Sequence, residues 1–263
     1  MRMSERDGYQ HAVPCWVDTW QPDPEAAAAF YTGIFGWDVE TGSPAASTRY
    51  DMCRLGGRDV AAIGSPPPEG AAPAWTTYVW VDDVDAMAAA AEAAGGSVVA
   101  GPFASLDGGR LAMVADPAGA VLGLWQPGAH RGAQRVNEPG AYGMSWLRAP
   151  DPDGAAAFYG TVLGWTTEPF GEATMFRLPG YVGGEPWQPV SREVVAVMTS
   201  AAPDEPARWD VDFWIADADA AAARAPELGG AVVADPYDTP GFREAVLADP
   251  AGATFRISAL KRG

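Results

Sequence analysis

The hydrophobic and polar positions of the chain follow an order that predicts a strand, a helix and about three further strands. Residues 15–20 predict the first strand, and Asp23 stands where its side chain can cap a helix. In that helix Phe30 and Ile34 share one face, and Gly36 marks its end. Short apolar runs then predict strands at residues 37–40, 49–55 and 60–63.

The same order of elements returns three more times along the chain. Further helices are predicted from Asp151 to near Gly164 and at residues 83–94 and 217–228. Further strands are predicted at residues 75–81, 98–99, 111–114, 121–125, 143–148, 209–215, 231–233, 245–247 and 254–258.

Two stretches of the sequence recur in the same order. Pro22 begins PDPEAAAAFYTGIFGW, and Pro150 begins PDPDGAAAFYGTVLGW. Arg110 begins RLAMVADPAGAVLGLW, and Arg243 begins REAVLADPAGATFRIS. The offsets of 128 and 133 residues place one copy in each half of the chain, so the sequence is a tandem duplication. We expect these boundaries: tail 1–11, first domain 12–128, linker 129–140 and second domain 141–263.

The paired βαβββ units, together with the phrases AAFY and ADPAGA, resemble the vicinal-oxygen-chelate superfamily of glyoxalase- and bleomycin-resistance-like proteins. The resemblance covers nearly all of residues 12–259. It implies an α+β fold of two tandem domains, in each of which two βαβββ units form one U-shaped mixed sheet. The concave face of each sheet is implied to be a cup for a small molecule. Members include glyoxalases, extradiol dioxygenases, bleomycin-binding proteins and some tailoring enzymes of aromatic polyketides.

Metal-using members of this superfamily carry their ligands on the concave face. The corresponding positions here are Trp16, Thr76 and Gly123 in the first copy, and Met144, Asp210 and Arg256 in the second. Neither set suits a divalent cation, which prefers imidazole and carboxylate ligands. His11, before the first strand, and His130, in the linker, are expected at the surface. The sequence therefore predicts no metal and no cofactor, unless a one-residue shift of register turns other side chains to the concave face.

The first cup is predicted to be aromatic. Side chains alternate along a strand, so residues of the same parity as the ligand positions share the concave face. They are Trp16, Asp18, Trp20, Thr76, Tyr78, Trp80 and Trp125. The rings either bind a planar, partly polar ligand or simply fill the space beneath the loops. Gly123 replaces a large side chain, so we expect this cup to be the roomier of the two.

Asp18 has two interpretations. Among the rings its carboxyl group would be desolvated, which raises the pKa and suits a general acid or base near neutral pH. Alternatively Asp18 is a structural acid, held by Arg49, Arg54 or a backbone amide.

The second cup is predicted to be charged. Its residues are Met144, Trp146, Arg148, Asp210, Asp212, Trp214 and Arg256. Two acids facing two arginines either form a structural ion-pair network or recognise a carboxylate or enolate and shuttle a proton. From both cups, the catalytic candidates are Asp18, Asp210, Asp212 and Arg256. The ligand-binding candidates are Trp16, Trp20, Thr76, Tyr78, Trp80, Trp125, Trp146, Arg148 and Trp214.

Composition narrows the classes of partner. The 263 residues are 48% hydrophobic and 19% charged, which suits two globular domains. A formal net charge of −17 disfavours nucleic acid and anionic membranes, because both require basic surfaces. The chain has no apolar run of the roughly 18 residues that span a bilayer, and MRMSERDGYQ lacks the apolar core of a signal peptide. Two cysteines are too few for a disulfide framework, so we expect a cytoplasmic protein.

Three functions from different classes remain. The first is a metal-independent enzyme that acts on a polycyclic, polyketide-like aromatic compound by proton transfer, in an aldol-type cyclisation, a dehydration or a ketal formation. The second is a drug-binding or self-resistance protein of the bleomycin-resistance type. The third is a metal-dependent glyoxalase or dioxygenase with a different register. In each case the partner is a small molecule, and the fused duplication is expected to be a monomer that imitates a dimer or to dimerise again.

Overall fold

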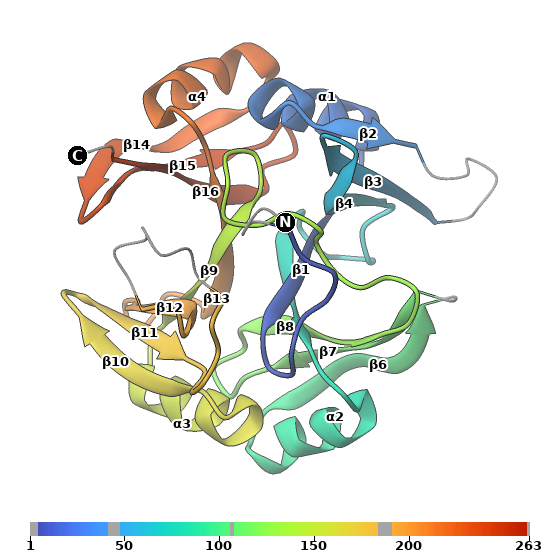
Figure 1. Cartoon of the computed structure of the whole chain (residues 1–263), viewed down its shortest axis with the longest axis vertical. Coiled ribbons are helices and arrows are strands. Elements are labelled where there is room, and N and C mark those ends of the chain that lie inside the picture. Colours follow the sequence, from blue (N-terminus) through green and yellow to red (C-terminus); the bar gives the residue numbers. More distant parts are fainter. Residues whose placement is uncertain (1–4, 42–47, 106–107, 184–190, 262–263) are drawn as a thin grey trace.

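The computed structural model describes residues 5–41, 48–105, 108–183 and 191–261, which form two eight-stranded mixed sheets (Figure 1). Each half of the chain builds one sheet. Residues 1–4 of the expected tail and residues 262–263 of the second domain lie outside the described residues.

Two βαβββ units form the first sheet. Its strands are β1 (Pro14–Trp20), β2 (Asp38–Glu40), β3 (Arg49–Leu55), β4 (Arg58–Ser65), β5 (Trp75–Trp80), β6 (Ser97–Ser105), β7 (Gly109–Ala115) and β8 (Val121–Pro127). They lie in the order β2-β3-β4-β1-β5-β8-β7-β6. Within each unit the first and last strands are parallel neighbours, whereas β1 and β5 join the units as an antiparallel pair.

The second sheet repeats this topology. Its strands are β9 (Tyr142–Ala149), β10 (Thr166–Phe170), β11 (Ala173–Arg177), β12 (Val194–Ser200), β13 (Arg208–Trp214), β14 (Ala231–Thr239), β15 (Phe242–Ala248) and β16 (Thr254–Leu260). They lie in the order β10-β11-β12-β9-β13-β16-β15-β14, with β9 and β13 as the antiparallel pair that joins the units. The expected fold of two tandem domains, each built from two βαβββ units, is confirmed.

One helix follows the first strand of each unit. The helices are α1 (Pro24–Phe35), α2 (Val84–Ala93), α3 (Pro152–Leu163) and α4 (Ala218–Arg224). The Asp23 side chain accepts the N–H of Ala26 and caps α1, as expected. The helix expected at 217–228 is shorter, because Pro226 has no N–H to continue it, and a 3-10 turn (Pro226–Leu228) follows. Among the helices in the described ranges, none is long and apolar enough to cross a membrane.

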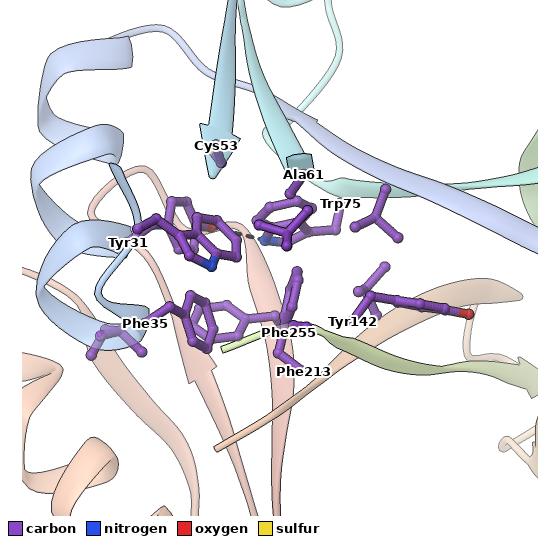
Figure 2. Packing of buried hydrophobic residues seen from close by; sticks show 14 of the residues in the cluster. Tyr31, Phe35, Cys53, Ala61, Trp75, Tyr142, Phe213 and Phe255 are labelled. Atoms are coloured by element: carbon purple, nitrogen blue, oxygen red, sulfur yellow. Dashed lines mark hydrogen bonds between the residues drawn. The ribbon is translucent and has the colours of Figure 1, made fainter. Parts of the chain in front are cut away.

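The two domains share their hydrophobic cores. Helix α1 lies beside α4, and α2 lies beside α3 (Figure 1), so each contact pairs helices from different domains. One core consists mainly of the first unit of the first domain and the second unit of the second domain, with side chains of β5 added, and another core consists mainly of the other two units. Rings from both domains meet in the first of these cores (Figure 2): Tyr31, Phe35, Trp75, Phe213 and Phe255.

Glycines at equivalent positions of the two copies permit this close approach. A Cβ atom at Gly230 would lie 2.5 Å from the ring of Phe30 in the other domain. A Cβ atom at Gly96 would lie 2.8 Å from the ring of Phe158, again across the domains. The glycines that end the second helix of each domain thus leave room for the AAFY helix of the other.

The repeated phrases also form hydrogen bonds between the domains. The hydroxyl of Tyr31 donates to Oδ2 of Asp249 over 2.9 Å, and that of Tyr159 donates to Oδ2 of Asp116 over 3.0 Å. Each hydrogen bond links the AAFY motif of one domain to the ADPAGA motif of the other. The two domains are therefore held together by a reciprocal pair of buried tyrosine–aspartate contacts.

Candidate functional site

Each sheet has one face toward the other domain and one face away from it. On β5 the hydroxyl of Thr77 contacts the other domain, so the alternate positions project from the opposite face. The register places Asp18 opposite Thr76 and Trp16 opposite Tyr78 on that outer face. We call this face of the first sheet the first cup, with the residues Trp16, Asp18, Trp20, Thr76, Tyr78, Trp80 and Trp125.

Asp18 is a buried carboxyl group in the first cup, only 2% exposed. Its Oδ2 accepts hydrogen bonds from the hydroxyls of Tyr50 over 3.0 Å and Tyr78 over 3.1 Å. Its Oδ1 is buried without a hydrogen-bond partner among the described residues. Burial raises the pKa of Asp18 to about 7, against the lowering effect of hydrogen bonds from Tyr50, Tyr78 and Trp20.

The arginines considered as partners of Asp18 pair with other acids. Arg49 binds Asp51 over 2.7 Å, and Arg54 binds Asp59 over 2.8 Å. The interpretation of Asp18 as an arginine-held acid is therefore wrong. Tyrosine hydroxyls hold it instead, and a phenol contributes no positive charge that would keep the carboxylate ionised.

The linker crosses the first cup instead of lying at the surface. His130 was expected to be exposed, but its ring centre lies 4.3 Å from that of Trp16 and 5.5 Å from that of Trp125. The backbone N–H of His130 donates to the carbonyl of Gly108. Burial lowers the pKa of His130, which favours the neutral imidazole. We call residues 128–134 the strap.

The first cup is filled by its own side chains. Tyr78 lies over Gly123, where a Cβ atom would be 2.1 Å from the tyrosine ring. The guanidinium carbon of Arg131, in the strap, lies 5.4 Å from the ring centre of Trp80. Trp80 and Trp125 are each 6% exposed. The expectation that this cup is the roomier one is wrong, because the Tyr78 ring occupies the volume that Gly123 leaves.

The equivalent face of the second sheet, the second cup, contains a connected polar network around Arg256. Its Nη2 donates to Oε2 of Glu244 over 2.7 Å and to the hydroxyl of Tyr237 over 2.8 Å. The hydroxyl of Thr239 donates to the other oxygen of Glu244 over 2.8 Å. The guanidinium carbon of Arg256 lies 4.2 Å from the ring centre of Trp146. The second cup comprises these residues together with Met144, Arg148, Asp210, Asp212 and Trp214.

Asp212 and Glu244 are the two buried carboxyl groups of the second cup, each 3% exposed, and Asp212 is the one that no arginine binds among the described contacts. Its Oδ1 accepts the hydroxyl of Ser258 over 2.7 Å, and the register places it opposite Arg256 and Met144. Burial, with a smaller contribution from the charge of Glu244, raises the pKa of Asp212 to about 8. The Ser258 hydrogen bond and the charge of Arg256 oppose that rise.

The other predicted acid and arginine of the second cup pair with residues outside the predicted set. Asp210 accepts from Arg208 Nε over 3.1 Å, and Arg148 donates to Glu205 over 3.0 Å. The expected network of two acids facing two arginines is therefore wrong in its pairings. Trp214 packs with its ring centre 5.7 Å from that of a residue on β15, Phe242.

Some residues of the cups were missed by the sequence analysis, and one of them carried a signal. Glu244 stands where the first copy has Leu111, in an otherwise apolar strand, so a charged side chain was recognisable there. The face of Tyr50 could not be fixed, because β3 has no ligand position to set its parity. His130 lies in the linker, where no periodicity predicts a contact.

A surface hollow of about 500 Å³ lies elsewhere in the molecule. It is lined by residues 5–10 of the N-terminal segment, by residues 181–183 and by Arg192. We place the candidate site in the cups instead, because the buried carboxyl groups with raised pKa values lie there.

Family models match both halves of the chain. The model of the Glyoxalase/Bleomycin resistance protein/Dioxygenase superfamily matches residues 15–124, and that of a glyoxalase-like domain matches residues 144–258. CFP32 of Mycobacterium tuberculosis, a candidate glyoxylase, is 40% identical over 260 residues, which are 97% of each chain. The chain belongs to the glyoxalase/bleomycin-resistance/dioxygenase superfamily. DnrV of Streptomyces peucetius, an anthracycline biosynthesis protein, is 34% identical over 265 residues, with 95% of this chain and 94% of DnrV covered.

Solved structures of glyoxalases and dioxygenases share the fold. The Mn(II)-bound glyoxalase of Novosphingobium aromaticivorans has a TM-score of 0.65 at 16% identity, covering 96% of this chain and 83% of its own. The 2,2',3-trihydroxybiphenyl 1,2-dioxygenase of Sphingomonas wittichii has a TM-score of 0.63 at 17% identity, covering 95% and 91%. The resemblance expected from the repeated sequence motifs is confirmed. At these sequence identities the solved structures show a common fold and nothing more.

The superfamily includes metal-bound members, so the donor groups of the cups decide whether a metal fits here. Among the residues that the structure describes, no group of three or more His, Cys, Asp and Glu side chains could hold a metal ion. The first cup has one carboxylate and the imidazole of His130 among phenols and indoles, which is fewer than three metal-binding side chains. In the second cup the guanidinium of Arg256 lies against Glu244 and would repel a cation. The side chains of the described residues do not fit a metal ion.

Proposed function

We propose that this protein binds an aromatic, polyketide-like small molecule in its cups and acts on it by acid–base chemistry without a metal. The observation that carries the proposal is the buried carboxyl group in each cup, Asp18 and Asp212, with pKa values of about 7 and 8. A group that titrates near the working pH can both accept and return a proton. The donor sets described above favour organic chemistry over metal chemistry in these faces.

Asp18 is arranged to transfer a proton through one of its oxygens. Oδ2 is occupied by the two tyrosine hydroxyls, whereas Oδ1 has no hydrogen-bond partner at normal distance among the described residues, although the Trp20 indole also stabilises the carboxylate. A substrate would therefore approach Oδ1. As a carboxylate, Asp18 would take a proton from the carbon beside a ketone of the substrate, leaving an enolate. The enolate would form a carbon–carbon bond with a second carbonyl, and Asp18 would return its proton to the new alkoxide. Tyr50 and Tyr78 stabilise the ionised form of Asp18, because both donate to it.

The aromatic character of the proposed substrate is supported by the cup and by one branch of relatives. Four tryptophans and two tyrosines line the first cup, and flat rings of this kind stack on planar ligands. DnrV and its Streptomyces relative DauV are named as anthracycline biosynthesis proteins. Aldol-type cyclisation, dehydration and ketal formation are the reactions that we expect of such a site.

The test uses 2-acetylnaphthalene, an aryl ketone with acidic methyl protons, as the probe in D₂O. The wild-type chain is expected to speed deuterium incorporation into the methyl group over buffer alone, as followed by proton NMR. The double variant Asp18→Asn/Asp212→Asn is expected to lose this acceleration, by about 100-fold or more. Asp204→Asn, at an exposed loop acid, is the matched control and is expected to match the wild type.

Each part of the proposal has its own contrary result. Full activity of the double variant would refute the acid–base roles. Loss of exchange after dialysis against EDTA, with recovery on adding Mn²⁺ or Zn²⁺, would refute metal independence.

A second candidate function is sequestration of an aromatic compound without chemistry. The observation that favours it is the strap, which lays His130 and Arg131 against the rings of the first cup and would enclose a bound ligand. Probe binding, measured by quenching of tryptophan fluorescence, together with no deuterium exchange in the wild type would favour this function.

A further inference from the structure

The two cups differ in which kind of polar atom lacks a partner. In the first cup the unpartnered buried atoms are Oδ1 of Asp18 and Nε2 of His130, and a carboxylate oxygen can only accept. In the second cup they are Nε1 of Trp146, Nε of Arg148 and Nε of Arg256, all within the described residues. Indole and guanidinium nitrogens can only donate. The second cup therefore lacks acceptors, whereas the first cup has one acceptor oxygen and one imidazole nitrogen, which donates or accepts according to its tautomer.

The three donors of the second cup belong to one surface. Trp146 and Arg148 are alternate residues of β9 and project from the same face. The guanidinium of Arg256 lies over the ring of Trp146, with 4.2 Å from its carbon to the ring centre. Buried donors without acceptors are costly and therefore rare in folded proteins. Three of them on one face of a sheet indicate that something else supplies the acceptors.

A ligand can reach this surface from solvent. The side chains of Arg256 and Arg148 are 15% and 33% exposed, and Trp146 is half-buried, so a turn of these side chains suffices to present their N–H groups. The first cup is more closed, with Trp16 4% exposed beneath the strap. The second cup is thus the more accessible of the two.

The positive and negative side chains of the second cup neutralise one another, so the cup does not favour a highly charged ligand. Arg148 is paired with Glu205, and Arg256 with Glu244. Asp212, next to Arg256 in register, is largely protonated at neutral pH, since burial raises its pKa to about 8. Such a surface suits a neutral carbonyl oxygen or a single carboxylate.

We propose that the second cup is a binding site for oxygen acceptors of an aromatic ligand, a ketone, quinone or carboxylate oxygen that receives hydrogen bonds from Trp146, Arg148 and Arg256. The inference rests on the proposed function in one respect, that the cups bind organic ligands.

Three probes on one aromatic frame test this inference by isothermal titration calorimetry of the full chain. They are 2-acetylnaphthalene, 2-naphthoate and 2-naphthol, which present a ketone, a carboxylate and a hydroxyl. Trp146→Phe removes one donor and keeps the ring, so it is expected to weaken binding of the ketone or carboxylate probe about ten-fold while 2-naphthol binding is unchanged. Binding of only one of the two acceptor probes would identify which oxygen the cup takes.

A second variant guards against a change in folding. Arg256→Met/Glu244→Gln removes an arginine together with its partner, so no buried charge is left alone. It is expected to weaken the same acceptor probes at least ten-fold, whereas Arg224→Met, at an exposed helix arginine, is expected to have no effect. Thermal melting checks that each variant is folded.

The contrary outcomes separate this inference from the proposed function. Unchanged binding of both acceptor probes to Trp146→Phe and to the double variant overturns the inference. If the double variant Asp18→Asn/Asp212→Asn still abolishes catalysed exchange in that case, the proposed function stands. If exchange survives loss of both carboxylates while acceptor binding depends on Trp146, the inference stands and the proposed chemistry fails. Absence of binding of all three probes refutes both.

Discussion

Asp18 and Asp212 occupy different strands of otherwise equivalent cups. The copy of Asp18 is Trp146, and the copy of Tyr78 is Asp212, because the repeats align Trp75 with Trp209. In the first cup the carboxyl group stands on β1 and is held by tyrosine hydroxyls, whereas in the second it stands on β13 and is held by Ser258. Each cup thus has one buried acid without an arginine partner, Asp18 or Asp212, and the two project from different strands.

The raised pKa values of these two acids predict how stability depends on pH. Between about pH 4 and pH 7 the folded protein keeps a proton on Asp18 that the unfolded chain has released, and for Asp212 this range extends to about pH 8. The free energy of unfolding should therefore fall as pH rises through this range, by up to about 1.4 kcal/mol per pH unit for each group. Their contribution is fully present below about pH 4, where both states are protonated.

Urea unfolding at pH 5 and pH 8 measures this effect. Asp18→Asn removes the cost of ionising a buried group, so its stability relative to the wild type should improve by about 3 kcal/mol between those pH values. Asp204→Asn, the exposed control, should track the wild type. A pH-independent difference between Asp18→Asn and the wild type would contradict the assignment.

At this scale strand alternation predicted the outer-face residues of β1 and β5 but not their partners. Parity fixed the side on which Asp18 and Asp212 project, since period two leaves no choice once the register is known. It could not reveal that Tyr50 or Glu244 lies beside them, because a hydrogen-bond partner comes from a strand distant in sequence. Asp210 shows a different limit, since its partner is Arg208, two residues away on the same strand, and not an arginine across the cup.

The strap is the element that most changes the picture of the first cup. Ala133 donates to the carbonyl of Cys15, and the carbonyl of His130 accepts from the indole of Trp125 over 3.1 Å. A linker that is hydrogen-bonded to β1 and to a cup residue covers the rings and limits how a ligand enters. Entry to the first cup therefore requires movement of residues 128–134.

Removal of the His130 ring should loosen the strap. His130→Ala loses two edge-on ring contacts and is expected to lower the free energy of unfolding by about 1–2 kcal/mol. It should also increase the fraction of tryptophan fluorescence that acrylamide quenches, because Trp16 and Trp125 become accessible. Urea unfolding and quenching on the same samples measure both effects.

Two further variants serve as controls for the His130→Ala result. His130→Phe keeps the ring contacts and removes a buried nitrogen that has no partner in the described structure, so it should be at least as stable as the wild type. His11→Ala, at a histidine that is 41% exposed, should leave both measurements unchanged. A His130→Ala variant with wild-type stability and quenching would argue against a covering role.

Most elements were predictable because each is specified by local signals. The cap at Asp23 and the glycine at Gly36, which has a φ of +72°, define a helix without help from the rest of the fold. Strands were less well bounded. The strand expected at 98–99 extends over Ser97–Ser105, because pairing with β7 continues through a sequence that lacks strong alternation. Neither the strap nor the break at Pro226 follows from hydrophobic periodicity.

At the scale of the whole molecule, the two reciprocal tyrosine–aspartate contacts differ in the number of side chains that donate to the aspartate. Oδ2 of Asp249 accepts from Tyr31 and also from Gln21, over 2.6 Å. Oδ2 of Asp116 accepts from Tyr159, with no second side-chain donor among the described residues. Loss of one tyrosine hydroxyl should therefore cost more at Asp116 than at Asp249.

Phenylalanine substitutions test this difference. Tyr159→Phe should lower the free energy of unfolding by about 2–3 kcal/mol, and Tyr31→Phe by about 1–2 kcal/mol, because Gln21 continues to serve Asp249. Urea unfolding followed by circular dichroism gives both values. A single transition is expected in each case, since the cores are shared between domains. Two separated transitions, or equal costs, would show that the contacts do not couple the domains in this way.

The packing of one domain against the other could not be predicted from the sequence. The spacing of Phe30 and Ile34 indicates a buried helix face, but it does not identify the partner of the neighbouring Tyr31. The structure places that partner in the other half of the chain, more than 200 residues away at Asp249.

A symmetric dimer of identical chains cannot alter one of its sites alone, because every mutation appears in both. In this protein the two copies are encoded in tandem, so a mutation that moves an acid from one strand to another changes a single cup. The interface records the older symmetry, since Tyr31 with Asp249 mirrors Tyr159 with Asp116. Because the two copies are separate stretches of one chain, each concave face can change by mutation without the other. The shared interface is unaffected by such changes, so natural selection could act on each cup independently.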